Sequence, residues 1–358
     1  MSRHGNRSKK LTRVLVTGVG GRSFGNQILY ALLLKEDYHI VTTDADPFSF
    51  GLYQTPNRYI VPFANDPEYL PAVLRIVKQE KLNAILPGTE AENLVLANNR
   101  ETFAALGCTI IASHTEIIRL CNDKAKINTW LGDNGFLTPR TVTVSDWRAL
   151  VADVGFPVIG KPTRNTGGSR NVAILQDATE VEQFLLHVPN RDEIIFQEYV
   201  GTHEDEYTVG VLVAKDGAII DSIVIHRKLI GLSLGEKRVI GHATYALSTG
   251  YSQGFIIKHD FIQKSCEQLA TTLGIRGPLN IQCRLAGDKL YIFEVHPRFS
   301  GTTSIRADVG FNEPDILIRN FLGDETIGRL DYRYNVAAIR AFRSILAPMQ
   351  DLATVPRG

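Results

Sequence analysis

Cysteine is scarce in this chain, and its four copies form no recognisable framework. Cys108, Cys121, Cys266 and Cys283 are widely spaced and make no CxxC pair. This spacing suggests neither a zinc site nor a disulfide scaffold, so a reducing compartment is the simpler setting. We therefore expect a cytoplasmic protein.

Long apolar runs and an excess of one charge sign are lacking as well. No segment approaches the roughly 18 apolar residues of a membrane span, and the formal net charge is only +1. Such a balance gives no general attraction to nucleic acid or to an anionic membrane, and we expect neither as a partner. Residues 1–10 are basic but are not followed by an apolar region and a small-residue cleavage site, so we expect a disordered tail.

The composition is that of an ordinary globular protein. Hydrophobic residues make up 44% and charged residues 22% of the 358 residues. A chain of this length predicts two or three packed units, each able to bury a substantial core. It shows no internal repeat and no low-complexity segment.

Short apolar runs alternate with helix-like segments over residues 11–115. Strands are predicted at 13–17, 39–43, 84–87 and 109–112, and helices at 26–34, 69–81 and 91–106. This alternation predicts an α/β domain with a parallel sheet and helices on both faces.

A glycine-rich turn, Gly18–Gly25, follows the first of these strands. A dinucleotide fingerprint would need glycine where this chain has Ser23, although Asp44 ends the second strand, where an NAD-binding protein places its ribose acid. Any tight passage from a strand into a helix also needs glycine. An NAD-dependent enzyme is therefore a minor alternative.

The pattern changes after residue 113. We expect a broken helix over 114–131, helices at 146–154, 261–273 and 314–322, and strands at 156–162, 172–175, 193–200, 206–213, 218–226 and 336–345. Gly167 and Gly168 lie between two of these strands. They either aim backbone N–H groups at phosphate oxygens or form a plain hairpin turn. Residues 231–248 show no assignable pattern.

Residues 279–295 predict a hairpin with an unusual polar face. Asn280, Gln282 and Arg284 alternate with apolar residues, and Glu294 and His296 share a face of the second strand. Oxygen ligands of this kind suit Mg²⁺ that is shared with substrate phosphates. The alternative is an amphipathic hairpin with a solvated polar face.

Six motifs occur in an order that resembles the ATP-grasp family, in particular ligases related to the large subunit of carbamoyl phosphate synthetase. They are Asp123-Lys124, Val158–Pro162, Gly167–Ser169, Gln197–Val200, Glu206–Val209, and Asn280–Gln282 with Phe293–Gly301. The resemblance covers residues 11 to about 325. It implies a Rossmann-like domain over 11–115 and a two-lobed ATP-grasp domain over 116–330, with its small lobe at about 140–200. Residues 331–358 would form a C-terminal strand and tail.

The resemblance also implies how ATP is held. Lys124 and Lys161 would contact phosphates, while Gly167, Gly168 and Ser169 would close over the triphosphate. Backbone groups of Glu198, Tyr199 and Val200 would face adenine. Glu206 would bind the ribose hydroxyls. Glu294 would bridge two Mg²⁺ ions, with Gln282 as a further ligand.

Two positions depart from the family, and one of them matters for the metal. The glycine loop carries Arg170 where the family often has another glycine. His296 stands where the second metal ligand is usually asparagine. Neutral imidazole is a poorer Mg²⁺ ligand than an oxygen donor. Either His296 binds through water, or Mn²⁺ is tolerated, or the ion rests mainly on Glu294. His296 alternatively makes a local hydrogen bond and binds no metal.

The implied reaction is carboxylate activation by MgATP. The acyl phosphate formed is attacked by an amine to give an amide or peptide bond, with release of ADP and phosphate. Arg298 would stabilise the transferring phosphoryl group, and Arg306 would clamp a substrate carboxylate unless it is a surface arginine. The cationic segments 226–228 and 237–238 either line the acceptor site or are solvated.

The expected partners are a small-molecule carboxylate and an amine, and family habit suggests a homodimer. The principal alternative is a non-catalytic ATP-binding sensor or assembly protein that keeps the fold.

Overall fold

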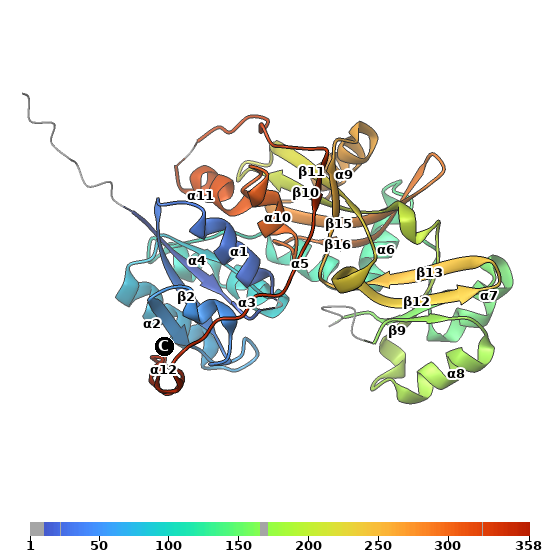
Figure 1. The fold of residues 1–358 in the computed structure, drawn as a ribbon, viewed down its shortest axis with the longest axis horizontal. Helices are drawn as coiled ribbons and strands as arrows, with labels where there is room; N and C mark the ends of the chain where they lie inside the picture. Colours follow the sequence, from blue (N-terminus) through green and yellow to red (C-terminus); the bar gives the residue numbers. More distant parts are fainter. Residues whose placement is uncertain (1–10, 22, 165–170, 324) are drawn as a thin grey trace, which may run out of the picture. The chain divides into compact units, whose positions relative to one another are not determined.

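The computed structural model describes residues 11–21, 23–164, 171–323 and 325–358. They divide into two compact units (Figure 1). The first comprises residues up to Ala112 together with Pro314–Glu325 and Ser344–Gly358, and the second comprises Ser113–Glu313 and Thr326–Arg343. The predicted basic tail, residues 1–10, lies outside the described residues. No helix in the described part of the chain has the length and apolar character of a membrane span.

The first unit is built on a parallel sheet with strand order β3-β2-β1-β4-β5. The strands are β1 (Thr12–Thr17), β2 (Tyr38–Asp44), β3 (Asn57–Ile60), β4 (Ala84–Leu86) and β5 (Thr109–Ile110). The connecting helices are α1 (Phe24–Leu33), α2 (Tyr69–Glu80), α3 (Glu90–Asn98) and α4 (Arg100–Ala104). The predicted Rossmann-like domain is confirmed, although β3 was not predicted.

The glycine turn after β1 has a packing reason. Gly18 has a positive φ of 57°, and a Cβ there would lie 2.4 Å from Oε2 of Glu92. Glu92 is buried and accepts hydrogen bonds from Thr89 and Tyr69. Burial raises the pKa of Glu92 to about 7, while its hydroxyl partners oppose the shift. The close packing against Glu92 therefore explains glycine at position 18 without a bound dinucleotide.

The last residues of the chain extend the first unit. The amide of Ile60 donates to the carbonyl of Pro356 (2.8 Å), and the amide of Gly358 donates to the carbonyl of Ile60 (2.9 Å). This parallel pairing follows helix α12 (Met349–Thr354). The strand predicted at 336–345 is confined to β17 (Val336–Ala338).

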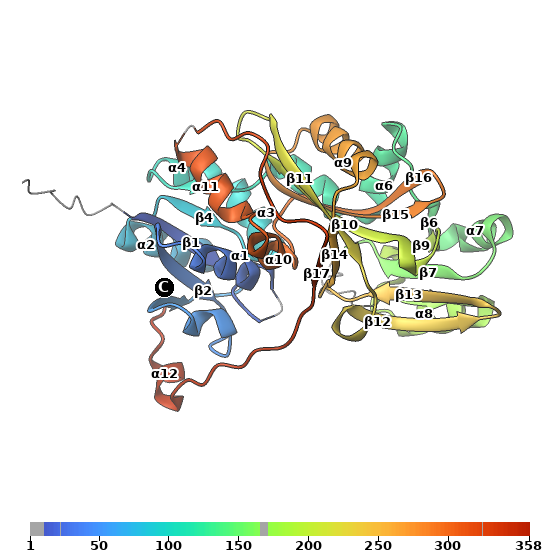
Figure 2. The same ribbon diagram turned by 45° about the horizontal axis from the view of Figure 1, so that its top comes forward.

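The second unit contains a small antiparallel sheet with the order β6-β9-β7-β8. Its elements are β6 (Thr141–Thr143), α7 (Trp147–Val154), β7 (Val158–Pro162), β8 (Ala173–Leu175), α8 (Ala178–His187) and β9 (Ile194–Glu198). Trp147, Leu150 and Phe196 are in its buried core. Helix α8 and the hairpin of β12 (Leu234–Ile240) and β13 (Ala243–Ser248), in the unassigned segment, were not predicted (Figure 2).

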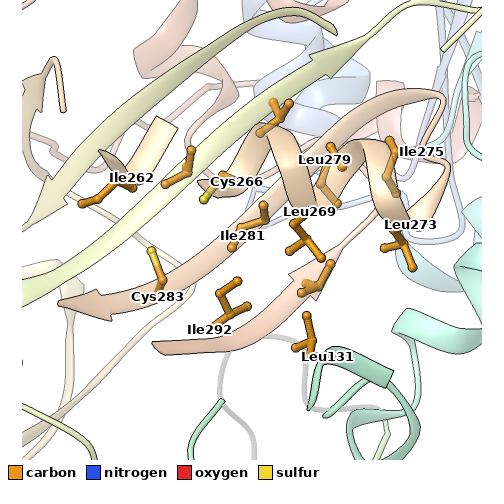
Figure 3. Close-up of a cluster of buried hydrophobic side chains, with 14 of the residues drawn as sticks. Leu131, Ile262, Cys266, Leu269, Leu273, Ile275, Leu279, Ile281, Cys283 and Ile292 are labelled. Carbon is orange, nitrogen blue, oxygen red and sulfur yellow. The ribbon is translucent and has the colours of Figure 1, made fainter. Parts of the chain in front are cut away.

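The large sheet of the second unit is antiparallel, with the order β16-β15-β10-β11-β14-β17. Its further strands are β10 (Glu206–Val213), β11 (Ile219–Arg227), β14 (Gly254–Ile257), β15 (Gly277–Ala286) and β16 (Lys289–His296). One face packs on α9 (Asp260–Leu273) and on α6 (Lys124–Asp133), with Ile281, Leu269 and Leu131 in the shared core (Figure 3). The second unit also contains α5 (Thr115–Cys121) and α10 (Thr303–Asp308), whereas α11 (Glu313–Gly323) belongs to the first unit from Pro314 onward. Short 3-10 helices lie at Phe50–Tyr53, Val144–Asp146, Arg191–Glu193, His203–Asp205 and Gly231–Ser233.

Candidate active site

Polar side chains gather on the face of the large sheet opposite that core. In the β15–β16 register Gln282 lies beside Glu294 and Asn280 beside His296, while Arg284 lies beside Glu206 of β10. Because side chains alternate along a strand, these residues occupy one face. The predicted hairpin and its polar face are therefore confirmed.

Glu294 is the central acceptor of this face. Its Oε2 accepts from Nε2 of Gln282 and interacts with Nε2 of His296, both at 3.0 Å. Burial alone would raise the pKa of Glu294. The hydrogen bond and charge of His296, together with Lys124 and Lys161, nevertheless lower that pKa well below its usual value. The site therefore holds Glu294 as a carboxylate.

Lys161 lies on β7 with only 4% of its surface exposed. Its Nζ donates to Oε1 of Gln197 (2.8 Å), and Nε2 of Gln197 donates to Thr141 (2.8 Å). Burial lowers the pKa of Lys161 to about 8, while the charge of Glu294 opposes this shift. The mutual influence places the ammonium and the carboxylate within electrostatic reach of each other.

Lys124 is the first residue of α6, and local bonds hold that helix start. The side chain of Asp123 accepts from the amide of Lys126 as the N-cap and from Nη2 of Arg164 (2.7 Å). The amide of Lys124 donates to the carbonyl of Thr163 (3.0 Å). The helix is thereby fastened to the segment that leads into Gly167, Gly168 and Ser169, which lie outside the described residues.

The predicted adenine-facing segment follows β9. The amide of Glu198 donates to the carbonyl of Arg140 (2.9 Å), and the carbonyl of Val200 accepts from Nη1 of Arg284 (3.2 Å). The Tyr199 hydroxyl donates to the carbonyl of Ala246 and accepts from its amide, both at 3.0 Å. The segment is thus connected to β13 and β15, and its contact with adenine stays a prediction.

Glu206 is almost inaccessible, with 1% of its surface exposed. Its Oε1 accepts from Nη1 of Arg227 (2.7 Å), and its Oε2 accepts from Nη2 of Arg284 (2.8 Å). Both carboxylate oxygens therefore have arginine partners. Ribose binding by Glu206 remains a prediction, and this arrangement does not favour it.

The two arginines predicted for catalysis lie in different surroundings. The amide of Arg298 donates to the carbonyl of His296 (2.8 Å), and its Nη1 donates to the carbonyl of Phe299 (2.9 Å). Arg306 is 1% exposed and donates to Glu313 (2.7 Å) and to Asn280 (2.8 Å). Arg306 is therefore a buried, paired side chain, which does not favour its predicted contact with a substrate carboxylate.

Sequence reasoning placed Arg284 on the polar face without a role, and left Arg227 either lining the acceptor site or solvated. Arg227 is not solvated, because it is buried. Both guanidinium groups are buried on the polar face, and both meet Glu206. Alternation placed Arg284 on this face, but no local pattern distinguished Arg227 from its cationic neighbours. Its partners Glu206 and Gln282 lie 21 and 55 residues away in the chain, so the pairing depends on the strand order.

Two family models match separate parts of the chain. Residues 14–111 match a model described as a PylC-like N-terminal domain, and residues 191–342 match one described as ATP-grasp in the biosynthetic pathway with Ter operon. The chain contains an ATP-grasp domain. The match to this domain includes Glu206, Gln282 and Glu294 on the polar face.

Curated relatives of this chain include carbamoyl phosphate synthase large chains. Identity is 25% over 308 residues with the protein of Vibrio vulnificus and 24% over 309 residues with that of Streptomyces avermitilis. Each alignment covers 81% of this chain but only 27% or 26% of the relative. The chain therefore spans about a quarter of the length of the curated relatives it matches.

Solved structures share the fold of this chain. N5-carboxyaminoimidazole synthetase from Staphylococcus aureus complexed with ADP superimposes with a TM-score of 0.65 at 13% identity, covering 90% of this chain and 81% of that one. L-amino acid ligase from Bacillus licheniformis gives 0.62 at 17% identity, with coverage of 88% and 75%. At such identities the likeness concerns the fold.

The donors around Glu294 fit a Mg²⁺ ion that is shared with nucleotide phosphates. Mg²⁺ in such sites is commonly held by one or two carboxylates and completes its shell with phosphates and water. Glu294 supplies an ionised carboxylate, and the two hydrogen bonds above both use its Oε2. In the described part of the chain no three or more His, Cys, Asp or Glu side chains form a metal-binding group.

Proposed function

We propose that this chain is an ADP-forming carboxylate–amine ligase that uses MgATP. The observation that carries the proposal is the charge arrangement at Glu294. An ionised carboxylate lies within electrostatic reach of Lys124 and Lys161 on the polar face of an ATP-grasp sheet. Such a site meets the needs of phosphoryl transfer, which are positioning and charge compensation more than covalent catalysis.

The proposed reaction has two steps. A carboxylate oxygen of the substrate attacks the γ-phosphorus, the bond to the bridging oxygen breaks, and ADP leaves. The amine then attacks the acyl carbon, an amide bond forms as the C–O bond to phosphate breaks, and the amine loses a proton. Lys124, Lys161 and Arg298 bind the negative oxygens in this proposal.

Glu294 would hold the Mg²⁺ ion, with His296 beside it. The ion would neutralise charge on the β- and γ-phosphates. The interaction of His296 with Glu294 is consistent with a residue that orients the carboxylate. We do not propose Mn²⁺ as the physiological ion, and use it only to probe the site. The carboxylate and amine are proposed as small molecules, because L-amino acid ligase and N5-carboxyaminoimidazole synthetase share the fold.

The test is ADP and phosphate release by the purified protein with MgATP, across pairs of amino acids and small carboxylates with amines. The Glu294→Ala and Arg298→Ala variants should lose acceptor-dependent release. Glu116→Ala is the matched control, because Glu116 is an exposed carboxylate paired only at the surface with Arg119, and it should keep full activity.

Each other outcome points elsewhere. AMP release would replace acyl phosphate formation with adenylation. Stabilisation by ATP without any release would favour the non-catalytic sensor. A nicotinamide absorbance change without ADP release would favour the NAD alternative. Either of the last two results contradicts the proposed ligase activity.

A further inference from the structure

Arg227 joins two parts of the polar face that sequence reasoning treated separately. It ends β11 with 1% of its surface exposed. Its Nη1 donates to Oε1 of Glu206 (2.7 Å) and to Oε1 of Gln282 (3.0 Å), and its Nη2 donates to the carbonyl of Thr249 (3.1 Å). One guanidinium therefore contacts both the carboxylate predicted for ribose and the amide predicted for metal.

The partners of Gln282 determine which way its amide faces. A guanidinium only donates hydrogen bonds, so the Gln282 atom facing Arg227 must be the oxygen. An ionised carboxylate only accepts, so the atom facing Glu294 must be the nitrogen, at 3.0 Å from Oε2. The two contacts agree, and the opposite amide orientation would make both of them unfavourable.

This orientation has a consequence for the metal. An amide binds Mg²⁺ through its oxygen, and the Gln282 oxygen is directed at a buried cation. Its nitrogen instead orients Glu294, as the outer partners of metal ligands commonly do. Arg227 also interacts electrostatically with this site: burial lowers the Arg227 pKa, and the negative charges of Glu206 and Glu294 oppose that shift.

We propose that Arg227 is a positioning residue that turns Gln282 away from direct metal ligation and makes it the orienting donor to Glu294. The inference rests on the proposed MgATP site and deepens it. Glu294 and its neighbour His296 would then hold the metal, while Gln282 would orient Glu294 without touching the ion. Arg227 also pairs with Glu206, so the same side chain positions the residue predicted for ribose and the amide beside the metal site.

The test is a double-mutant cycle on metal affinity with ADP present, which needs no turnover. Mn²⁺ is titrated by electron paramagnetic resonance into the ADP complexes of wild type, Arg227→Met, Gln282→Met and the double variant. Each single variant should bind Mn²⁺ about tenfold more weakly, as for lost outer partners of metal ligands. The double variant should be no weaker than either single variant. Additive losses would overturn the inference.

A charge-preserving variant separates geometry from charge. Arg227→Lys keeps the cation but loses the planar fork that reaches Glu206, Gln282 and Thr249 together. It should resemble Arg227→Met, whereas wild-type Mn²⁺ affinity would show that Arg227 acts only through its charge. If Arg227→Met fails to fold, Arg227→Lys and Gln282→Met still test the inference. Wild type that binds no Mn²⁺ with ADP would instead remove the proposed function.

Discussion

At Gly210 a missing side chain makes room for a buried ion pair. A Cβ there would lie 2.3 Å from Nη1 of Arg306 and 2.7 Å from Oε1 of Glu313. Both of these side chains are 1% exposed and pair at 2.7 Å. Glycine in the middle of an otherwise valine-rich strand is unfavourable by itself. The close approach of Arg306 is its physical reason.

Gly210→Ala should lower the free energy of unfolding by at least about 2 kcal/mol, because overpacking adds to the disturbance of a buried ion pair. Urea unfolding followed by circular dichroism measures this. Gly132→Ala, on helix α6, is the matched control and should be neutral or stabilising. Apart from the backbone of its own helix and its chain neighbours, no atom of the described residues lies within 4 Å of the added Cβ. Equal stability of both variants would contradict the packing argument.

Glu92 should make the stability of the chain depend on pH. Its folded pKa is raised from 4.5 to about 7 by burial, so the folded state keeps a proton that the unfolded state releases. Stability is therefore lost as pH rises from about 4.5 to 7 and then levels off. The free energy of unfolding of Glu92→Gln, relative to that of wild type, should therefore increase by up to about 3 kcal/mol from pH 4.5 to pH 8. Urea unfolding at both pH values measures this.

The affinity for nucleotide should fall at alkaline pH because of Lys161. Its pKa of about 8 means that the ammonium loses its proton above that pH and no longer attracts phosphate. We expect ADP affinity to be about tenfold weaker at pH 9 than at neutral pH, measured by isothermal titration calorimetry. Lys161→Arg, which stays charged, should bind with little pH dependence, and an equally steep profile would assign the effect elsewhere.

At the scale of elements, the start of α6 combines a helix cap with a candidate phosphate contact. Asp123→Ala removes the cap and the pair with Arg164, and should cost about 1 kcal/mol of stability together with several-fold of ADP affinity. Asp177→Ala removes the equivalent cap of α8 and should cost similar stability but no affinity. Thermal unfolding and ADP titration of both variants test this. Unchanged ADP affinity in Asp123→Ala would separate this helix start from the nucleotide site.

At the scale of the whole molecule, the two units should respond differently to nucleotide. MgADP at a hundred times its dissociation constant should stabilise the second unit by about 2.7 kcal/mol. Hydrogen exchange should then slow in β7, the segment after β9, and the β15–β16 hairpin, but not in β1 to β5. Protection confined to the glycine turn after β1 would instead support a dinucleotide site. Glu294→Ala should abolish the response.

Much of the architecture could be predicted because local patterns carry it. Alternation of apolar and polar residues predicted β15, and a β-rich run predicted β16. The apolar runs of β1, β2, β4 and β5, which alternate with helical segments, predicted a parallel sheet. The β12–β13 hairpin, β14 and α8 were missed. Strand β14 has only four residues, and its pairings with β11 and β17 are long-range. No local period reveals partners at that distance.

By itself the sequence determined which residue types share a face, because alternation along a strand is a local property. It thus placed Gln282 with Arg284, and Glu294 with His296. Only the tertiary structure decided that Arg227 meets Gln282, that both oxygens of Glu206 face arginines, and that Arg306 is buried against Glu313. Those contacts depend on the strand order and on burial, since a charged side chain in the interior must find its partner there.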